Sequence, residues 1–203
     1  NFTPRAMTLD AFVANHSLVF LGLHGGIGED GTVQQQLQMA GVAYTGSGPA
    51  ASALCMNKYA TGQCISMLDS DGISVATKVR VPLKEVTNIN QSTIEQRWQD
   101  LTEQLRTHSV IVKPIGDGCS AGVARLYSAR DLKQYLVCTF KGVERLPVGT
   151  LHRQLTIVEM PTEKPESLLF EPFIETDDVF VVGGEIFWKS VTDWVEITVG
   201  VLG

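Results

Sequence analysis

The chain has 203 residues, of which 44% are hydrophobic and 19% are charged, a balance typical of a folded globular protein. Its formal net charge of −6 at pH 7 argues against a nucleic-acid partner, because phosphate backbones are bound by basic surfaces. The sequence has no apolar stretch long enough to cross a bilayer, and its four cysteines form no Cys-x-x-Cys pair, so membrane, zinc and redox functions are disfavoured.

The first third of the sequence predicts part of a parallel α/β unit. Ser17 to Leu23 is a nearly continuous apolar run, which is typical of a strand buried on both faces of a parallel sheet. Apolar residues recur at helical spacing from Val33 to Ala40, and Val42 to Thr45 predicts a second strand. After a turn-rich stretch, one helix is expected from about Ser52 to Asp69.

A glycine loop, Gly26 to Gly31, joins the first strand to the first helix with the spacing G-x-G-x-x-G. In this context the spacing is typical of dinucleotide-binding proteins. However, Glu29 and Asp30 place carboxylates where a pyrophosphate would need the positive helix N-terminus. The strand Val42 to Thr45 is followed by no acidic residue for a ribose. We therefore interpret Asp30 as a helix cap and expect any nucleotide site elsewhere.

The rest of the sequence predicts an α+β unit with an antiparallel sheet. A strand near Val75 to Val81 precedes an amphipathic helix over Ser92 to Arg106, which opens with a capping box of Ser92 and Glu95. A second amphipathic helix follows a cap at Ser128.

The C-terminal third alternates between irregular and strand-like segments. Gly142 to Glu166 has no clear period, and we interpret it as an insertion or a mobile loop. Gly183 and Gly184 predict a tight hairpin turn. The remaining expected strands of the second half are Val110 to Lys113, Val123 to Tyr127, Leu168 to Ile174, Val179 to Val182, Ile186 to Lys189 and Val195 to Val201.

The segment VIVKPIGDGCSAGV has the composition of a phosphate site. Lys113 supplies a point charge at the end of an apolar strand, and the turn after it supplies exposed backbone N–H groups. These N–H groups belong to Gly116, Gly118, Cys119 and Ser120. An ordinary flexible hairpin with an edge lysine explains the same residues, and composition alone leaves the two alternatives even.

The segment FEPFIE is a second candidate. Pro172 has no N–H, which argues for an edge strand or a hinge between domains. At a hinge, the C=O of Pro172 and the N–H of Ile174 could match the amino group and a ring nitrogen of adenine. A plain edge strand is the alternative, and it is favoured when the segment is considered alone. Glu196, also considered alone, is expected to be a solvated strand residue.

Three segments, in this order, resemble one enzyme family. HGGIGEDGTVQQQL with GVAYTGSGPAASALCMNK resembles the N-terminal signature of D-alanine–D-alanine ligases. VIVKPIGDGCSAGV resembles their phosphate loop, and LLFEPFIE with WVEITVGVLG resembles their adenine-binding strand and the strand after it. The resemblance runs from about Val19 to Gly203, and its wording is closest to plant and algal members.

The resemblance implies a partial ATP-grasp fold, α/β followed by α+β. Residues 1–54 would be the remnant of an N-terminal α/β domain, and residues 55–203 an incomplete central ATP-grasp domain. ATP and Mg²⁺ would be the cofactors and D-alanine the substrate. One D-alanine carboxylate would attack the γ-phosphate of ATP, and the amine of a second D-alanine would displace phosphate from the acyl phosphate.

The resemblance also implies residue roles, carried over position by position. Considered alone, His24 would be interpreted as a structural histidine. The implied set is His24 and Glu29 at the amino-acid end; Gly118, Cys119 and Ser120 in a loop that closes over the reacting groups and the nucleotide; Lys58 and Lys113 at the phosphates; Glu196 at the ribose; and Glu171, Pro172, Phe173 and Ile174 around the adenine.

Two positions depart from the family pattern. Cys119 stands where a serine is usual, and because a thiol is a weaker hydrogen-bonding group than a hydroxyl, weaker binding of the first substrate is expected. Pro172 stands where a lysine is common, but only its backbone carbonyl is required, so this change is expected to be tolerated.

The resemblance further implies that parts of the family's site lie outside the sequence. The first strand and loop would precede Asn1, and the catalytic arginine with the magnesium-binding acid and asparagine would follow Gly203. We interpret Asp177 and Asp178 as solvated turn residues and not as metal ligands. Without the metal set, charge on the transferred phosphoryl group would go unstabilised, so the 203 residues alone are expected to be inactive.

Alternatives remain open at this point. An ATP-grasp ligase for other amino acids and a non-catalytic ATP-binding homologue fit the same motifs. A homodimer is a further alternative, and the expected location is the cytoplasm or the plastid stroma.

Overall fold

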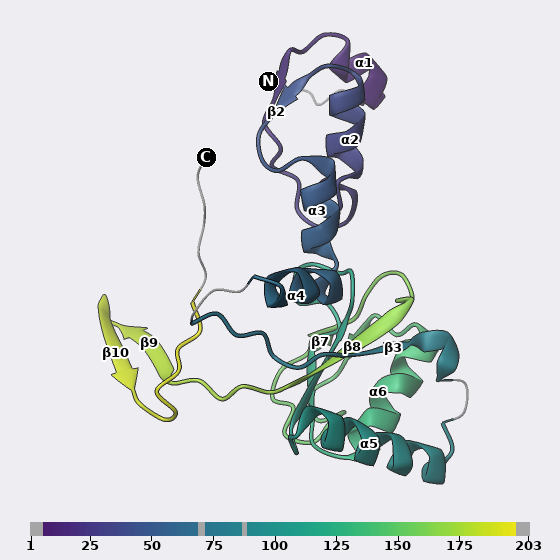
Figure 1. Ribbon diagram of the computed structural model, residues 1–203, viewed down its shortest axis with the longest axis vertical. Coiled ribbons are helices and arrows are strands. Elements are labelled where there is room, and N and C mark those ends of the chain that lie inside the picture. The colour runs from purple at the N-terminus through teal and green to yellow at the C-terminus, as the bar shows by residue number, and fades with distance from the viewer. Residues whose placement is uncertain (1–5, 69–71, 87–88, 198–203) are drawn as a thin grey trace.

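A computed structural model of the chain describes residues 6–68, 72–86 and 89–197. The N-terminal part, residues 6–56, stands above the rest of the molecule in Figure 1. Its elements are α1 (Leu9–Val13), β1 (Leu18–Val19), the 3-10 helix η1 (Gly26–Gly28), α2 (Thr32–Met39), β2 (Ala43–Tyr44) and α3 (Pro49–Met56).

The two strands of the N-terminal part pair in parallel, as predicted, with Leu18 opposite Ala43. The predicted burial on both faces is wrong, because Leu18 is 65% exposed and Phe20 is 81% exposed. Within the described residues this sheet has two strands, and its packing partner is the apolar face of α2 around Leu37. The side of the sheet away from α2 therefore remains open.

Two helices occupy the stretch where the sequence predicts one. α3 ends at Met56 and α4 (Lys58–Ser66) begins at once, with Asn57 between them in an extended conformation. The side-chain oxygen of Asn57 accepts hydrogen bonds from the N–H groups of Tyr59 and Ala60 at 3.1 and 3.0 Å. Asn57 thus caps a new helix, which turns in a different direction from α3 (Figure 1).

The central sheet is a four-stranded antiparallel sheet in the order β3-β8-β4-β5. Helices α5 and α6 pack against each other and cover one of its faces (Figure 1). Its main apolar core lies between the sheet and these helices, around Ile94, Leu132 and Phe170. The elements of this part are β3 (Val79–Pro82), the 3-10 helix η2 (Leu83–Glu85), α5 (Gln91–Leu105), β4 (Val110–Pro114), β5 (Ala124–Leu126), α6 (Ala129–Lys141) and β8 (Ser167–Pro172).

The two long helices were predicted from their periodicity, and both are confirmed. The cap of α6 is Ser128, as predicted, and its hydroxyl accepts from the N–H of Asp131. The capping box at Ser92 is wrong, because α5 begins two residues earlier than such a box requires. The cap is Asn90, which accepts from the N–H of Thr93, while the Ser92 hydroxyl donates to the same oxygen at 3.0 Å.

Pro172 ends β8, which lies inside the sheet between β3 and β4, so the edge-strand interpretation is wrong. The proline is tolerated because the pairs of β8 with β3 stop at Phe170, whereas those with β4 continue to Val110 opposite Pro172. The missing N–H therefore lies beyond the doubly paired part of the strand.

The segment Gly142 to Glu166 is packed and not a mobile loop. It contains the antiparallel pair β6 (Arg145–Leu146) and β7 (Val158–Glu159). Leu146, Leu151 and Met160 are buried in the main core. Its sequence shows no regular spacing of apolar residues because its strands are short and only isolated apolar residues enter the core.

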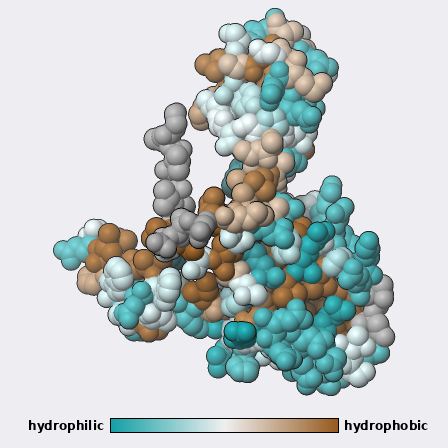
Figure 2. Space-filling model, viewed as in Figure 1, coloured by the Kyte–Doolittle hydropathy of each residue, from teal (hydrophilic) through white to brown (hydrophobic). Residues whose placement is uncertain are grey.

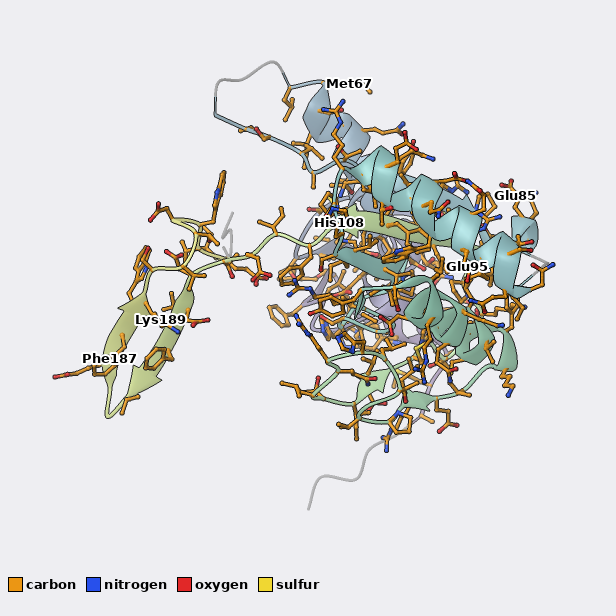
Figure 3. The ribbon with its side chains drawn as sticks, turned by 90° about the horizontal axis from the view of Figure 1, so that it is seen from below. Met67, Glu85, Glu95, His108, Phe187 and Lys189 are labelled. Atoms are coloured by element: carbon orange, nitrogen blue, oxygen red, sulfur yellow. The ribbon has the colours of Figure 1, made fainter. Side chains whose placement is uncertain are left out.

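A hairpin of β9 (Asp178–Val182) and β10 (Glu185–Lys189) follows the sheet, and its turn glycines have positive φ angles, so the predicted tight hairpin is confirmed. The hairpin projects from the body, and Figure 3 shows Phe187 and Lys189 far from the part that carries His108. Figure 2 shows apolar residues over it and along the neighbouring side of the body. Of the predicted strand Val195 to Val201, the residues up to 197 are irregular, and the others lie outside the described residues.

Candidate functional site

A cavity of about 1130 Å³ separates the N-terminal part from the central sheet. Its walls come from the η1 loop, α3, the first residue of α4, β4 with the loop after it, β8, and Trp194 to Glu196. The residues predicted for the site that line it are Glu29, Lys58, Lys113, Gly118, Cys119, Ser120, Glu171, Pro172, Phe173, Ile174 and Glu196.

Strand alternation decides which side chains face this cavity. Along β4, Val110 and Val112 are buried in the core, whereas Ile111 and Lys113 point to the opposite face and line the cavity. Residues opposite each other in an antiparallel pair share a face, and Ile111 lies opposite Glu171 of β8. One face of the sheet thus carries the core, and the other carries the charged groups.

Glu171 lies between two ammonium groups. Its Oε2 is 2.5 Å from Nζ of Lys113, and its Oε1 pairs with Nζ of Lys78. Glu171 is 8% exposed, and burial alone would raise the pKa of its carboxyl. The hydrogen bonds and charges of Lys113 and Lys78 outweigh burial, so the pKa of Glu171 lies below its ordinary value. The carboxylate is therefore ionised and doubly paired.

Lys78 is a member of this site that the sequence reasoning missed. It precedes β3 and reaches Glu171 past Gly62 of α4, where a Cβ would lie 2.9 Å from Cδ of Lys78 and closer still to its Cε. The available signal was the alternation Lys78-Val79-Arg80-Val81, which places Lys78 and Arg80 on the face away from the core.

Lys58 is a second lysine of the cavity, and it contacts the glycine-rich loop after β4. Its N–H donates to the carbonyl of Ile115 at 3.0 Å, and its ammonium donates to the carbonyl of Asp117. Burial lowers the pKa of Lys58, the positive charge of Lys113 lowers it further, and Asp117 and Glu171 partly offset both effects. Burial also raises the pKa of Asp117, an effect that Lys58 partly offsets. Desolvated positive charge therefore collects at this end of the cavity.

The loop after β4 offers backbone donors beside these lysines. Cys119 and Ser120 have φ angles of 52° and 55°, an unusual left-handed conformation for residues other than glycine. In the part of the chain that the structure describes, five consecutive N–H groups of the loop donate to no other residue. They are those of Gly116, Asp117, Gly118, Cys119 and Ser120. Consecutive free N–H groups in such a turn form a site for anionic oxygens.

The η1 loop reaches the same end of the cavity through Glu29. A Cβ placed on Gly118 would lie 3.2 Å from Oε2 of Glu29, so the two loops are in close contact. His24 is 73% exposed, and its Nδ1 hydrogen-bonds to Oε1 of Glu29 at 2.8 Å. The structure thus places His24 behind Glu29, outside the cavity lining. The N-cap of α2 is Gly31 and not Asp30, so the predicted cap is wrong; Asp30, one residue earlier, accepts from the N–H of Thr32 at 2.8 Å.

The segment after β8 is clamped by Arg125 of β5, a second residue that the sequence reasoning missed. Its guanidinium lies 3.5 Å above the ring of Phe173, and its Nη2 is 2.7 Å from Oε1 of Glu175. Its Nε donates to the hydroxyl of Ser109 at 2.5 Å. Among the described residues, no acceptor bonds to the N–H of Ile174, so this donor remains available to the cavity.

The interpretation of Asp177 as a solvated residue is wrong. It is 5% exposed, and its carboxylate accepts from the indole of Trp188 and from the N–H groups of Val191, Thr192 and Asp193. Its own N–H donates to the carbonyl of Trp194 at 2.6 Å. These hydrogen bonds fix the segment before Trp194. The residues from Trp194 to Glu196 line the cavity.

The described residues contain no group of three or more His, Cys, Asp or Glu side chains arranged to hold a metal ion. None of the helices they form is long and apolar enough to cross a membrane.

Comparison with known proteins finds similarity to D-alanine–D-alanine ligases. Residues 3–47 match the family model described as D-ala D-ala ligase N-terminus. A D-alanine–D-alanine ligase from Leptospira interrogans is 33% identical over 185 residues, which are 91% of this chain and 49% of that protein. The chain therefore spans about half the length of this curated relative.

Solved structures give the same result for the fold. A D-alanine–D-alanine ligase from Bacillus anthracis, solved in complex with ATP, superposes with a TM-score of 0.56 at 21% identity over 84% of this chain and 45% of that one. The VanG D-Ala:D-Ser ligase from Enterococcus faecalis gives a TM-score of 0.54 at 23% identity over 85% of this chain and 41% of that one. The chain shares the fold of these ligases, and the predicted ATP-grasp fold class is confirmed. The boundary predicted at residues 54 and 55 falls within α3 and stays a prediction.

Proposed function

We propose that the cavity binds ATP, and that the protein to which this chain belongs uses it to join two D-alanines. One observation carries the proposal. Lys58, Lys113 and a loop with free backbone N–H groups converge on the cavity that Pro172 and Ile174 also line. Cationic side chains with free N–H donors suit phosphates, and a backbone acceptor beside a free donor suits the edge of an adenine.

The residues divide the nucleotide between them. Lys58 and Lys113 hold the phosphates, and the N–H groups from Gly116 to Ser120 hold phosphate oxygens. The Pro172 carbonyl and the Ile174 N–H read the adenine, with Phe173 beside it, and Glu196 accepts from the ribose hydroxyls. Burial supports this assignment, because desolvated ammonium groups attract anions more strongly than exposed ones.

In the ligation, ATP supplies the phosphoryl group that activates one D-alanine carboxylate for attack by the amine of the second. The loop from Gly116 to Ser120 excludes water from that group, and its N–H donors orient it. Glu29, held by His24, lies at the amino-acid end. Mg²⁺ is expected to accompany the nucleotide, but the described residues offer no acidic cluster that fits it, so no step is assigned to a metal.

A ligase for a different amino acid is the second candidate, and two observations favour it. A D-Ala:D-Ser ligase has the same fold. Cys119, an exposed cysteine in the cavity lining, is a weaker hydrogen-bonding group than the hydroxyl of a serine. The amino-acid end of the cavity would therefore decide between the two substrates.

Three finer features belong to the same proposal. The wording of the motifs supports a plant or algal type of ligase, and with it the cytoplasm or the plastid stroma as the location. A homodimer is compatible with the open side of the N-terminal part.

ATP binding and ligation are tested separately. Titration of a fluorescent ATP analogue into the protein is expected to show saturable binding that Lys113→Met weakens by about tenfold or more, because a phosphate contact is lost. Lys133→Met, on α6 and outside the cavity lining, serves as the matched control and is expected to leave binding unchanged.

For ligation, phosphate release from ATP by the whole protein to which this chain belongs is measured with D-alanine alone and with D-serine added, because the 203 residues alone are expected to be inactive. Release that depends on D-alanine supports the proposal, and a preference for D-serine as second substrate supports the second candidate. Binding that Lys113→Met and Lys133→Met affect equally would contradict the assigned site.

A further inference from the structure

We propose that Lys78 is a positioning residue that keeps Glu171 paired while Lys113 exchanges that carboxylate for a phosphate oxygen. The inference rests on the proposed binding of ATP in the cavity. It concerns a residue that does not line the cavity and that reaches the nucleotide site only through Glu171.

The two oxygens of Glu171 have separate partners. Oε2 faces Lys113, which lines the cavity, and Oε1 faces Lys78, which lies behind it. A phosphate entering the cavity would compete with Glu171 for the ammonium of Lys113. A carboxylate as buried as Glu171 cannot lose its only partner without a large loss of stability. With Lys78 in place, Lys113 can move and Glu171 remains paired.

Helix α4 holds Lys78 on this path. Gly62 leaves the space that the stem of Lys78 occupies, since a Cβ there would collide with its Cδ and Cε. The atoms that would be displaced are the flexible end of a lysine, so the helix itself can accept a Cβ. Helix α4 begins at Lys58, which is one of the two lysines assigned to the phosphates. The same helix, through Gly62, positions Lys78, which lets the second of them, Lys113, leave Glu171.

Removal of Lys78 is expected to tie Lys113 to Glu171. Lys78→Met should therefore weaken binding of the ATP analogue by about tenfold at pH 8. The same change removes one of the causes that lower the pKa of Glu171, so that pKa rises. As the pH falls through the raised pKa, Glu171 becomes neutral and frees Lys113, so the ratio of the affinity of the unmodified protein to that of Lys78→Met should shrink as the pH is lowered from 8.

Other charged groups surround Glu171, and they and ATP itself also titrate. The experiment therefore compares, at each pH, the affinity of the unmodified protein with that of Lys78→Met, because such titrations affect both proteins alike. On the same face or across the cavity these groups are Glu29, Lys58, Lys78, Arg80, Lys113, Asp117, Arg125 and Glu196.

A double-mutant cycle provides the decisive readout. In the Glu171→Gln background no carboxylate competes for Lys113, so adding Lys78→Met should change affinity by less than about threefold. Gly62→Ala displaces Lys78 but keeps its charge, and it should reproduce the loss at pH 8. Gly48→Ala, where a Cβ meets nothing within 4 Å, and Lys84→Met, at an exposed position of η2, are the controls and should bind as the unmodified protein does.

The outcomes separate this inference from the proposed function. Saturable binding by the unmodified protein with an equal loss from Lys78→Met in both backgrounds, or with no loss at all, overturns the role of Lys78 and leaves the ATP site standing. Absence of binding by the folded, unmodified protein overturns both. A Lys78→Met protein that unfolds at 25 °C, as judged by circular dichroism, contradicts a role confined to partner exchange.

Discussion

Asp177 accepts hydrogen bonds from three successive backbone N–H groups and from the Trp188 indole, and it connects the base of the hairpin to the residues that follow it. The backbone hydrogen bond from Thr192 and then that from Val191 lower its pKa from 3.8 to about 2. Because the folded pKa lies below the ordinary value, this carboxylate stabilises the fold above about pH 4, and the contribution is lost as the pH falls through 2.

Asp177→Asn is therefore expected to loosen the turn that follows the hairpin. A neutral amide oxygen accepts weaker hydrogen bonds than a carboxylate, so amide hydrogen exchange at Val191 to Asp193 should accelerate by roughly tenfold at neutral pH. Asp178→Asn is the matched control, because its partner Lys189 is 3.6 Å away and both side chains are exposed. Equal exchange in the two variants would show that the Asp177 carboxylate does not hold the turn.

At the same scale, the chemical roles of single residues were easier to predict from the sequence than the residues that contact them. The motif order identified Lys58, Lys113 and Glu171, which the structure brings to one cavity. It missed Lys78 and Arg125 because cross-strand and cross-element partners depend on register, which one sequence does not specify. Asp177 was misread for a related reason, since the three N–H groups that bury it lie fourteen to sixteen residues away.

The loop between β4 and β5 depends on one glycine at its closing end. Gly122 has a φ of 68°, and a Cβ on it would lie 2.9 Å from the ring of Pro114 and 3.1 Å from that of Pro161. Its N–H donates to Glu159 and its carbonyl accepts from the buried hydroxyl of Tyr135. The loop is thus fixed at its base by contacts with β4, β7 and α6.

Gly122→Ala is expected to destabilise the protein by about 2 to 4 kcal/mol, because a left-handed conformation and a collision with two rigid rings act together. Urea unfolding measures the change. Gly116→Ala in the same loop meets no atom within 4 Å and should stay within about 0.5 kcal/mol of the unmodified protein. A similar loss of stability in both variants would mean that the loop is uniformly sensitive to bulk.

Helices with a regular spacing of apolar residues were predictable from the sequence. A helix break at one polar residue and strands of two residues were not. The periods of α5 and α6 survive in the structure because each helix buries a single apolar face on the sheet. The break between α3 and α4 was missed because Asn57 caps the second helix from within a pattern that reads as continuous. The short strands β6 and β7 carry too few residues to show a period.

At the scale of the whole molecule, the two apolar clusters differ greatly in size. The main core joins the central sheet to α5 and α6, whereas the cluster of the N-terminal part has three buried members among the described residues, Val33, Leu37 and Val42. Since protection against exchange follows local burial, the amides of α2 are expected to exchange roughly a hundredfold faster than those of α6.

Hydrogen exchange followed by mass spectrometry measures this difference, and Leu37→Ala provides a check. That change should abolish protection in α2 and leave α6 unaffected. Loss of protection in both helices together would show instead that the N-terminal part and the central sheet unfold as one unit.

Gly62 illustrates how a position far from any ligand can constrain the way a sequence drifts. An alanine at 62 would displace only the flexible end of Lys78 and leave the helix intact, so selection for folding alone would permit it. What such a change would remove is the path of Lys78 to Glu171, so replacing either residue has the same expected consequence and replacing both adds little to it. We therefore expect positions 62 and 78 to vary together in related sequences, because a lysine that cannot reach Glu171 no longer contributes to the site.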